Sequence, residues 1–226
     1  MPLVVFDLDG TLVDSRQDLA DSTNAMLESL GASALHLDRV VMMVGDGARV
    51  LVQRALEAAG LPAEGAALDD ALKRFHACYR TRLLTTTRPY PGIAQMLAEV
   101  APMATLAMLT NKPLSPSQQL VDAFGWSTHF LQIIGGDGAL PRKPDPSGLQ
   151  QLMAIANAGP TSTLLVGDSM VDVETARNAG VPVCVVTYGF GHARGDMRLR
   201  GDEWLAETGP DVIRVIREWA AAQRSA

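Results

Sequence analysis

The chain has 226 residues, of which 47% are hydrophobic and 19% charged, and its formal net charge is −6. This composition fits one globular domain or a core with a small insert, and the acidic balance argues against nucleic acid or anionic membrane partners. A small anionic substrate stays possible, because a metal ion and a few lysines can reverse the potential in one pocket. With two cysteines and no apolar leader or span, we expect a cytoplasmic protein, either monomer or homodimer.

The chain opens with a short apolar strand, predicted over residues 3–7, that leads into two acids, Asp7 and Asp9. Carboxylates at the end of a buried strand repel each other, and their burial is costly unless a cation pairs with them. A hard divalent ion such as Mg²⁺ meets that need. Gly10 permits a sharp turn, and Thr11 adds a hydroxyl and an amide at the same place. The plainer alternative is a solvated turn after a strand.

The next segment interrupts the pattern of strands with several amphipathic helices. We therefore expect an all-helical cap domain over residues 15–87, inserted into an α/β core of residues 1–14 and 88–226. Within the cap, Gly45-Asp46-Gly47 is typical of a tight loop that would face a substrate, and Arg49 is the nearest cation. A solvated position on a helix is the alternative for Arg49.

Beyond the insert, apolar runs without polar alternation are separated by helical patterns. This is typical of a doubly wound, Rossmann-like parallel sheet that is covered on both faces. The predicted strands are residues 105–110, 132–135, 163–167 and 183–187, and the predicted helices are residues 93–99, 116–124, 147–157, 171–178 and 212–219.

Polar residues follow several of these strands. Thr110 and Asn111 can donate to phosphate oxygens, and Lys143 lies in a stiff proline-rich loop where it could neutralise an anion. Asp168 follows the strand 163–167, and Asp172 lies one helical turn later. Each residue alone fits an ordinary turn, a surface lysine or a helix cap. Because the carboxyl ends of parallel strands share one edge, we expect all of them to converge with the first acid pair.

In this order, the motifs strongly resemble those of the haloacid dehalogenase-like hydrolase superfamily. Residues 7–15 resemble its first motif, residues 109–111 its second, Lys143 its third and residues 167–172 its fourth. The resemblance covers nearly the whole chain and includes a helical cap in the place where such proteins carry one.

The resemblance implies a phosphomonoester hydrolase that works through an aspartyl-phosphate. Asp7 would be the nucleophile, and Asp9 would protonate the leaving oxygen and later activate water. Asp172 would orient Lys143 or a metal-bound water. The resemblance implies Mg²⁺ on Asp7, the main-chain carbonyl of Asp9 and Asp168, with support from Asp172, and a phosphate site formed by Gly10, Thr11, Thr110, the amide of Asn111 and Lys143.

Within the superfamily, residues 44–52, 110–113 and 188–191 are similar to those of bacterial phosphoglycolate phosphatases. This implies 2-phosphoglycolate or a similar small phosphorylated metabolite as the substrate, with the residues 45–47 and Arg49 facing it. A phosphosugar mutase keeps the same four motifs and remains an alternative, as does a non-catalytic binding protein, although the intact acids argue against the latter. Asp9 disfavours the dehalogenases of the superfamily, which lack an acid there.

Overall fold

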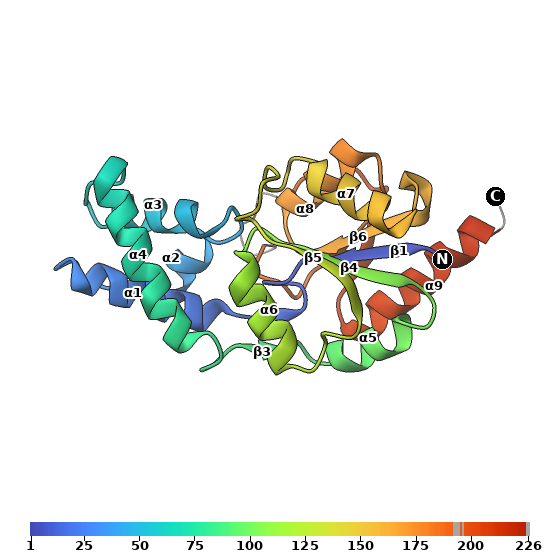
Figure 1. The fold of residues 1–226 in the computed structure, drawn as a ribbon, viewed down its shortest axis with the longest axis horizontal. Coiled ribbons are helices and arrows are strands. Elements are labelled where there is room, and N and C mark those ends of the chain that lie inside the picture. Colours follow the sequence, from blue (N-terminus) through green and yellow to red (C-terminus); the bar gives the residue numbers. More distant parts are fainter. Residues whose placement is uncertain (192–194, 196, 225–226) are drawn as a thin grey trace. The chain divides into compact units, whose positions relative to one another are not determined.

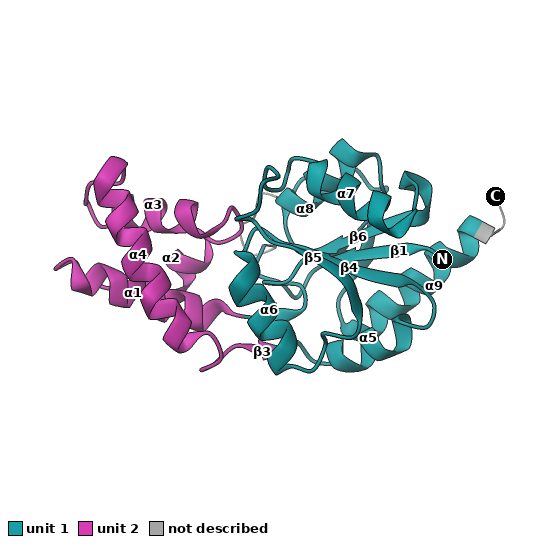
Figure 2. Ribbon diagram, in the orientation of Figure 1, with its two compact units in different colours: residues 1–14, 89–226 teal, residues 15–88 magenta. Residues whose placement is uncertain are grey.

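The computed structural model describes residues 1–191, 195 and 197–224. The chain forms two compact units, one of Met1–Asp14 with Pro89–Ala226 and one of Ser15–Arg88 (Figure 2). The second boundary lies one residue beyond the expected limit of the insert, 87. The two connections between the units pair as a short two-stranded sheet of β2 (Val13–Asp14) and β3 (Arg88–Pro89).

The first unit contains the predicted doubly wound sheet. It has six strands in the order β5-β4-β1-β6-β7-β8, and every neighbouring pair is parallel. Four strands lie within one residue of their predicted limits, while β5 begins two residues earlier and β8 is an additional strand at the edge. The strands are β1 (Leu3–Phe6), β4 (Thr105–Leu109), β5 (Phe130–Ile134), β6 (Thr163–Gly167), β7 (Val183–Val186) and β8 (Trp204–Ala206).

Helices cover both faces of this sheet, which explains the largely apolar sequence of its central strands. On one face lie α7 (Ser147–Ala156) and α8 (Met170–Ala179), and on the other α5 (Ile93–Val100) and α9 (Gly209–Arg224) (Figure 1). All four residues of β1 are fully buried. The remaining elements of the unit are α6 (Leu114–Ala123) and the 3₁₀ turn η1 (Pro160–Ser162).

The strand order places three chain segments side by side at one edge of the sheet. Phe6, the last residue of β1, is in register with Met108 of β4 and Val166 of β6. The residues that follow these three strands therefore emerge together. This register is what brings together polar side chains that are up to 165 positions apart along the chain, such as Asp7 and Asp172.

The second unit is helical, as predicted for the insert. Its helices are α1 (Arg16–Ser29), α2 (Leu37–Val41), α3 (Ala48–Ala58) and α4 (Gly65–Arg82), and α1 packs mainly against α4. Apolar residues spaced along one side of each helix form the core of this unit, for example Met26 of α1 and Phe75 of α4. Among the described residues of the whole chain, no helix combines the length and the apolar character needed to cross a bilayer.

One buried carboxylate ties the beginning of this unit to its end. Asp18 of α1 is fully buried and accepts hydrogen bonds from the main-chain N and the hydroxyl of both Thr86 and Thr87, at 2.6–3.1 Å. Burial raises the pKa of Asp18, but these hydrogen bonds outweigh it and hold the pKa below its ordinary 3.8. Asp18 therefore stabilises the fold above that pH, and the contribution is lost as the pH falls through its native pKa.

We expect Asp18→Asn to destabilise the second unit by about 3 kcal/mol at pH 7, because its amide group would face the four donors of Thr86 and Thr87. The three tryptophans all lie in the first unit, so their fluorescence would report little of this change. Amide hydrogen exchange of α1 and α4 measures it directly. Asp21→Asn, on the same helix but less buried, is the control, and an equal effect of both substitutions would contradict the prediction.

Candidate active site

Asp7 follows β1 directly, and its main-chain N extends the sheet by donating to Val166 O at 2.9 Å. Its carboxylate Oδ1 accepts from Leu8 N at 2.7 Å and lies 3.0 Å from Lys143 Nζ. Among the described residues we find no donor to the other oxygen, Oδ2. Burial raises the pKa of Asp7 to about 6, with Asp172 adding to the shift and Lys143 opposing it. One oxygen of this carboxylate is thus held while the other is left available.

The turn after Asp9 brings the main chain against a further carboxylate. Gly10 has a φ of +86°, and a Cβ at this position would lie 2.2 Å from Oδ2 of Asp168. A Cβ at Gly189, in the loop after β7, would lie 2.3 Å from the Cβ of Asp168. Only glycine permits both approaches. The sequence therefore builds a narrow cradle of main chain around the carboxylate that follows β6.

Two further contacts fix this cradle. Gly191 N donates to Asp168 Oδ2 at 2.7 Å, and Thr11 Oγ1 lies 3.5 Å from Oδ1. The hydroxyl of Tyr188 donates to the main-chain O of Thr11 at 2.9 Å. The segment 188–191 thus joins the loop after β7 to the loop after β1. The sequence indicates a family resemblance for this segment but no role at the site.

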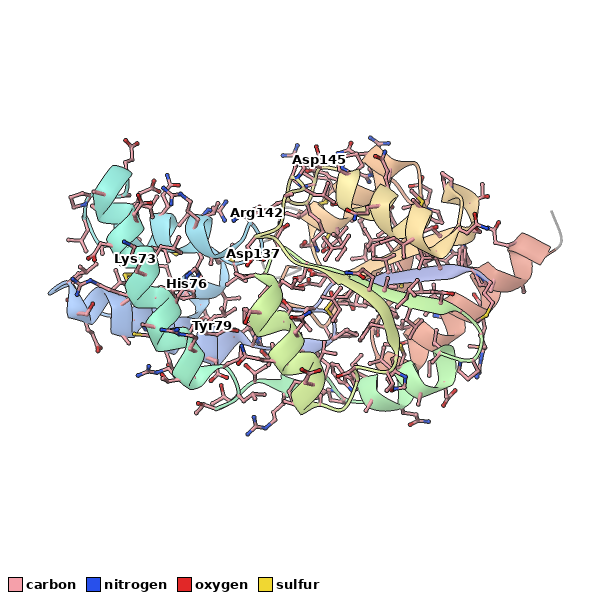
Figure 3. The ribbon with its side chains drawn as sticks, viewed as in Figure 1. Lys73, His76, Tyr79, Asp137, Arg142 and Asp145 are labelled. Atoms are coloured by element: carbon pink, nitrogen blue, oxygen red, sulfur yellow. The ribbon has the colours of Figure 1, made fainter. Side chains whose placement is uncertain are left out.

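Lys143 lies in the loop that precedes α7, between the labelled residues Arg142 and Asp145 (Figure 3). The side chain of Asn111 holds its main chain, because Nδ2 donates to Lys143 O at 3.0 Å and Oδ1 accepts from Lys143 N at 2.9 Å. The ammonium group reaches Asp172 Oδ1 at 2.6 Å as well as Asp7. Lys143 therefore bridges the acid after β1 and the acid in the first turn of α8.

Asp172 is fully buried and uses both carboxylate oxygens within the first unit. Oδ1 accepts from Lys143, and Oδ2 accepts from Ser169 N at 3.1 Å and from Ser169 Oγ at 2.7 Å. Of the two roles expected for Asp172, the structure shows the contact with Lys143. Ser169, which directly precedes α8, is the residue that anchors this acid.

The segment after β4 holds the next group of polar atoms. Thr110 Oγ1 accepts from Lys112 N at 3.2 Å, and a hydroxyl that accepts one bond still has its own proton to donate. Lys112 Nζ lies 3.0 Å from both carboxylate oxygens of Asp9. Lys112 is not among the site residues predicted from the sequence. Its position directly after a predicted strand end, in a chain with only three lysines, was the available signal.

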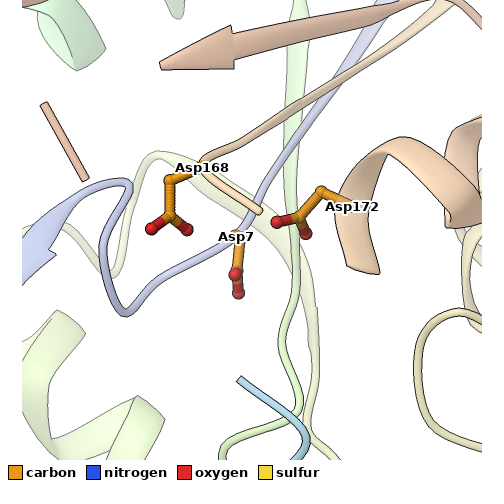
Figure 4. Close-up of side chains that lie close together, drawn as sticks. All are labelled: Asp7, Asp168 and Asp172. Atoms are coloured by element: carbon orange, nitrogen blue, oxygen red, sulfur yellow. The ribbon is translucent and has the colours of Figure 1, made fainter. Parts of the chain in front are cut away.

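Asp7, Asp168 and Asp172 place carboxylate oxygens within 4.8 Å of one another, and all three are buried (Figure 4). Among the described residues, Lys143 is the cation in direct contact with this cluster, so three ionised carboxylates would face one positive charge and leave two negative charges unbalanced. Burial, Asp172 and Asp7 accordingly raise the pKa of Asp168 well above its ordinary 3.8. A cluster of hard oxygen ligands with two excess negative charges fits a divalent cation such as Mg²⁺.

The predicted residues of the insert lie in the second unit, where each charged one has a partner. Arg49 Nη1 contacts Asp69 Oδ1 at 2.7 Å, and Asp46 Oδ2 contacts Arg54 Nη1 at 2.6 Å. Gly45 and Gly47 have positive φ angles of 124° and 91°, and Gly47 precedes α3. The predicted tight loop therefore depends on glycine at both positions.

Comparison with known proteins places these observations in a family. The family model of haloacid dehalogenase-like hydrolases matches residues 4–186. A phosphoglycolate phosphatase of Psychrobacter arcticus is 34% identical over 206 residues, covering 89% of this chain and 90% of the relative. One of Pseudomonas putida is 41% identical over 197 residues, covering 85% and 71%. A solved structure of a predicted phosphoglycolate phosphatase from Haemophilus somnus superimposes with a TM-score of 0.88 at 30% identity, covering 96% of this chain and 98% of that one.

Proposed function

The chain belongs to the haloacid dehalogenase-like hydrolases and is a phosphatase, and we propose that it hydrolyses 2-phosphoglycolate through an aspartyl-phosphate on Asp7, with Mg²⁺ bound. The observation that carries the proposed mechanism is the Asp7 carboxylate. It stands at the carboxyl end of a central strand, with Oδ1 held by Leu8 N and Lys143 and Oδ2 left available. A carboxylate presented in this way is suited to attack phosphorus.

In the first step, Oδ2 of Asp7 would attack phosphorus while Asp9 gives a proton to the ester oxygen that leaves. In the second step, Asp9 would take a proton from water as the water oxygen attacks the phosphoryl group on Asp7. The leaving alcohol is a poor leaving group without protonation, and water is a poor nucleophile without a base. Asp9 lies two residues from Asp7 and keeps 15% of its side chain exposed, which supports contact with both.

Lys143 and Thr110 would hold the transferring phosphoryl group, together with the main-chain amides of Gly10, Thr11 and Asn111. Lys143 is well placed for this, because Asn111 fixes its main chain and Asp172 fixes its ammonium group.

Asp7, Asp168 and the main-chain carbonyl of Asp9 are the groups proposed to hold Mg²⁺, with Asp172 acting through Lys143. When bound, the ion would offset negative charge on the phosphoryl oxygens.

We assign the choice of substrate to the second unit, as a cap domain over residues 15–87 that includes the loop 45–47 and Arg49. The names of the relatives support 2-phosphoglycolate, whose carboxylate would require a cation. Arg49 is half-exposed and already pairs with Asp69, so a substrate carboxylate would have to compete with that surface contact. Surface ion pairs of this kind contribute little stability, so breaking the pair with Asp69 would cost little free energy.

The proposal is tested by phosphate release from a panel of small phosphomonoesters that includes 2-phosphoglycolate. We expect a strong preference for 2-phosphoglycolate with Mg²⁺ and a loss of at least about 100-fold when EDTA removes the metal. If phosphate is released faster from other esters, the chain is still a phosphatase but 2-phosphoglycolate is not its preferred substrate. Release unaffected by EDTA would contradict the metal site. If a phosphosugar is isomerised faster than it is hydrolysed, the chain acts as a mutase instead.

A further inference from the structure

Lys112 lies at the carboxyl end of β4, and its ammonium group is 3.0 Å from both Oδ1 and Oδ2 of Asp9. The side chain of Lys112 is 3% exposed, whereas that of Asp9 is 15% exposed. The cation therefore lies deeper than the acid that it contacts. Asp9 keeps part of its surface open while its partner supports it from the interior.

The main chain of Lys112 is held on both sides. Its N donates to Thr110 Oγ1 at 3.2 Å, and its carbonyl O accepts from Gly136 N at 2.9 Å. Pro113, the next residue, directly precedes α6 and restricts the backbone further. With its stem fixed and its side chain buried, Lys112 places an ammonium group at a position set by the core rather than by solvent.

Such a fixed cation matters because an aspartate does not orient its own carboxylate. The terminal torsion of Asp is broad, so the plane of the group is set by its partners. For Asp7, these partners include Leu8 N and Lys143, which Asp172 also binds. For Asp9, they include Lys112, which contacts both carboxylate oxygens. Each of the two buried lysines thus holds one acid of the pair that follows β1.

We propose that Lys112 is a positioning residue that orients Asp9 for its two proton transfers, an inference that rests on the proposed function. An ammonium group donates three hydrogen bonds and accepts none, and Nζ lies 3.0 Å from both oxygens of Asp9, so a proton on either oxygen must point away from Nζ. In the first step, this proton passes to the ester oxygen as its bond to phosphorus breaks and the bond from Asp7 forms. In the second, the same oxygen takes a proton from water as the new phosphorus–oxygen bond forms and the bond to Asp7 breaks.

The test compares Lys112→Met with the wild type on ethyl phosphate and 4-nitrophenyl phosphate, neither of which carries a carboxylate, and on 2-phosphoglycolate, which does. The value of kcat/KM reports the steps up to and including transfer of the phosphoryl group to Asp7. In that step ethoxide needs a proton to leave, whereas nitrophenolate does not. We expect kcat/KM for ethyl phosphate to fall about 10- to 100-fold. For 4-nitrophenyl phosphate it should stay within about threefold, because little acid assistance is lost.

The controls separate this role from a structural one. Lys73→Met is the same substitution on the exposed side of α4 (Figure 3) and should change neither rate. Lys112→Arg, which retains a cationic donor, should recover part of the ethyl phosphate rate. If Lys112→Met fails to fold, Lys112→Gln takes its place, with folding checked by tryptophan fluorescence.

Equal losses on both esters would overturn the proposal and make Lys112 structural. A loss confined to 2-phosphoglycolate would also overturn it, since Lys112 would then bind the substrate carboxylate. The wild-type rates test the proposed function separately, because they do not depend on the variants. A wild type that hydrolyses neither ester nor 2-phosphoglycolate would overturn both proposals.

Discussion

Asp7→Asn is expected to lower phosphate release by about 10⁴-fold or more, because an amide cannot act as the nucleophile that attacks phosphorus. The substitution preserves the shape of the side chain and an oxygen that can accept from Leu8 N. It also removes a buried negative charge, for which burial has already raised the pKa to about 6. In metal-free buffer we therefore expect the Tm to equal or exceed that of the wild type. Loss of activity without loss of stability would separate a chemical role from a structural one.

The matched control is Asp202→Asn, the same change at an exposed aspartate before β8, which should retain wild-type activity. Acid-quenched wild type should carry a phosphoryl group that hydroxylamine removes, as expected of an acyl phosphate, and Asp7→Asn should carry none. A variant with more than about 1% of the wild-type rate would show that Asp7 is not the nucleophile.

The sheet was predictable where burial leaves a clear pattern. Strand β1 is apolar throughout and β6 is apolar after Thr163, because both faces are covered, and their limits follow from the residues that end them. The edge strand β8 was missed because it has three residues and leaves Leu205 half-exposed. Three apolar residues are too short a run to predict a strand, and only the pairing with β7 makes this segment one.

At the site, the sequence predicted which residues gather at the sheet edge but few of the contacts between their side chains. The contact between Lys112 and Asp9 joins positions 103 apart in the chain and depends on the register of β1 against β4. Asn111 was expected to offer an amide to phosphate, and the structure shows its side chain binding the main chain of Lys143. The side-chain amide of Asn could either donate to phosphate or bind a main chain, so only the fold decides which of these it does. Its main-chain amide remains the proposed phosphate donor.

Lys143→Met is expected to cost about 3–5 kcal/mol of unfolding free energy at pH 8, because it removes one partner of a buried ion pair. Lys143 is 2% exposed and contacts Asp172 at 2.6 Å and Asp7 at 3.0 Å. Without it, the carboxylate cluster has no direct counter-charge from the described residues. Urea denaturation in EDTA measures this loss, since the chelator removes any divalent ion that could compensate. Arg142→Met, in the same loop but exposed, should cost at most about 1 kcal/mol.

The destabilisation should depend on pH in a defined direction. Burial lowers the pKa of Lys143, but the opposing effect of Asp172 and Asp7 is larger, so the net pKa lies above the ordinary 10.5. The wild-type ammonium group therefore stays charged from pH 5 to pH 8. In the native variant, the clustered carboxylates can relieve their repulsion only by binding protons. In the unfolded variant the same carboxyl groups have ordinary pKa values and are deprotonated above about pH 4. The native variant then binds more protons than its unfolded state, and its stability rises as the pH falls. The cost of Lys143→Met should therefore be smaller at pH 5 than at pH 8, and an equal cost at both would mean that the lysine acts by packing rather than by charge.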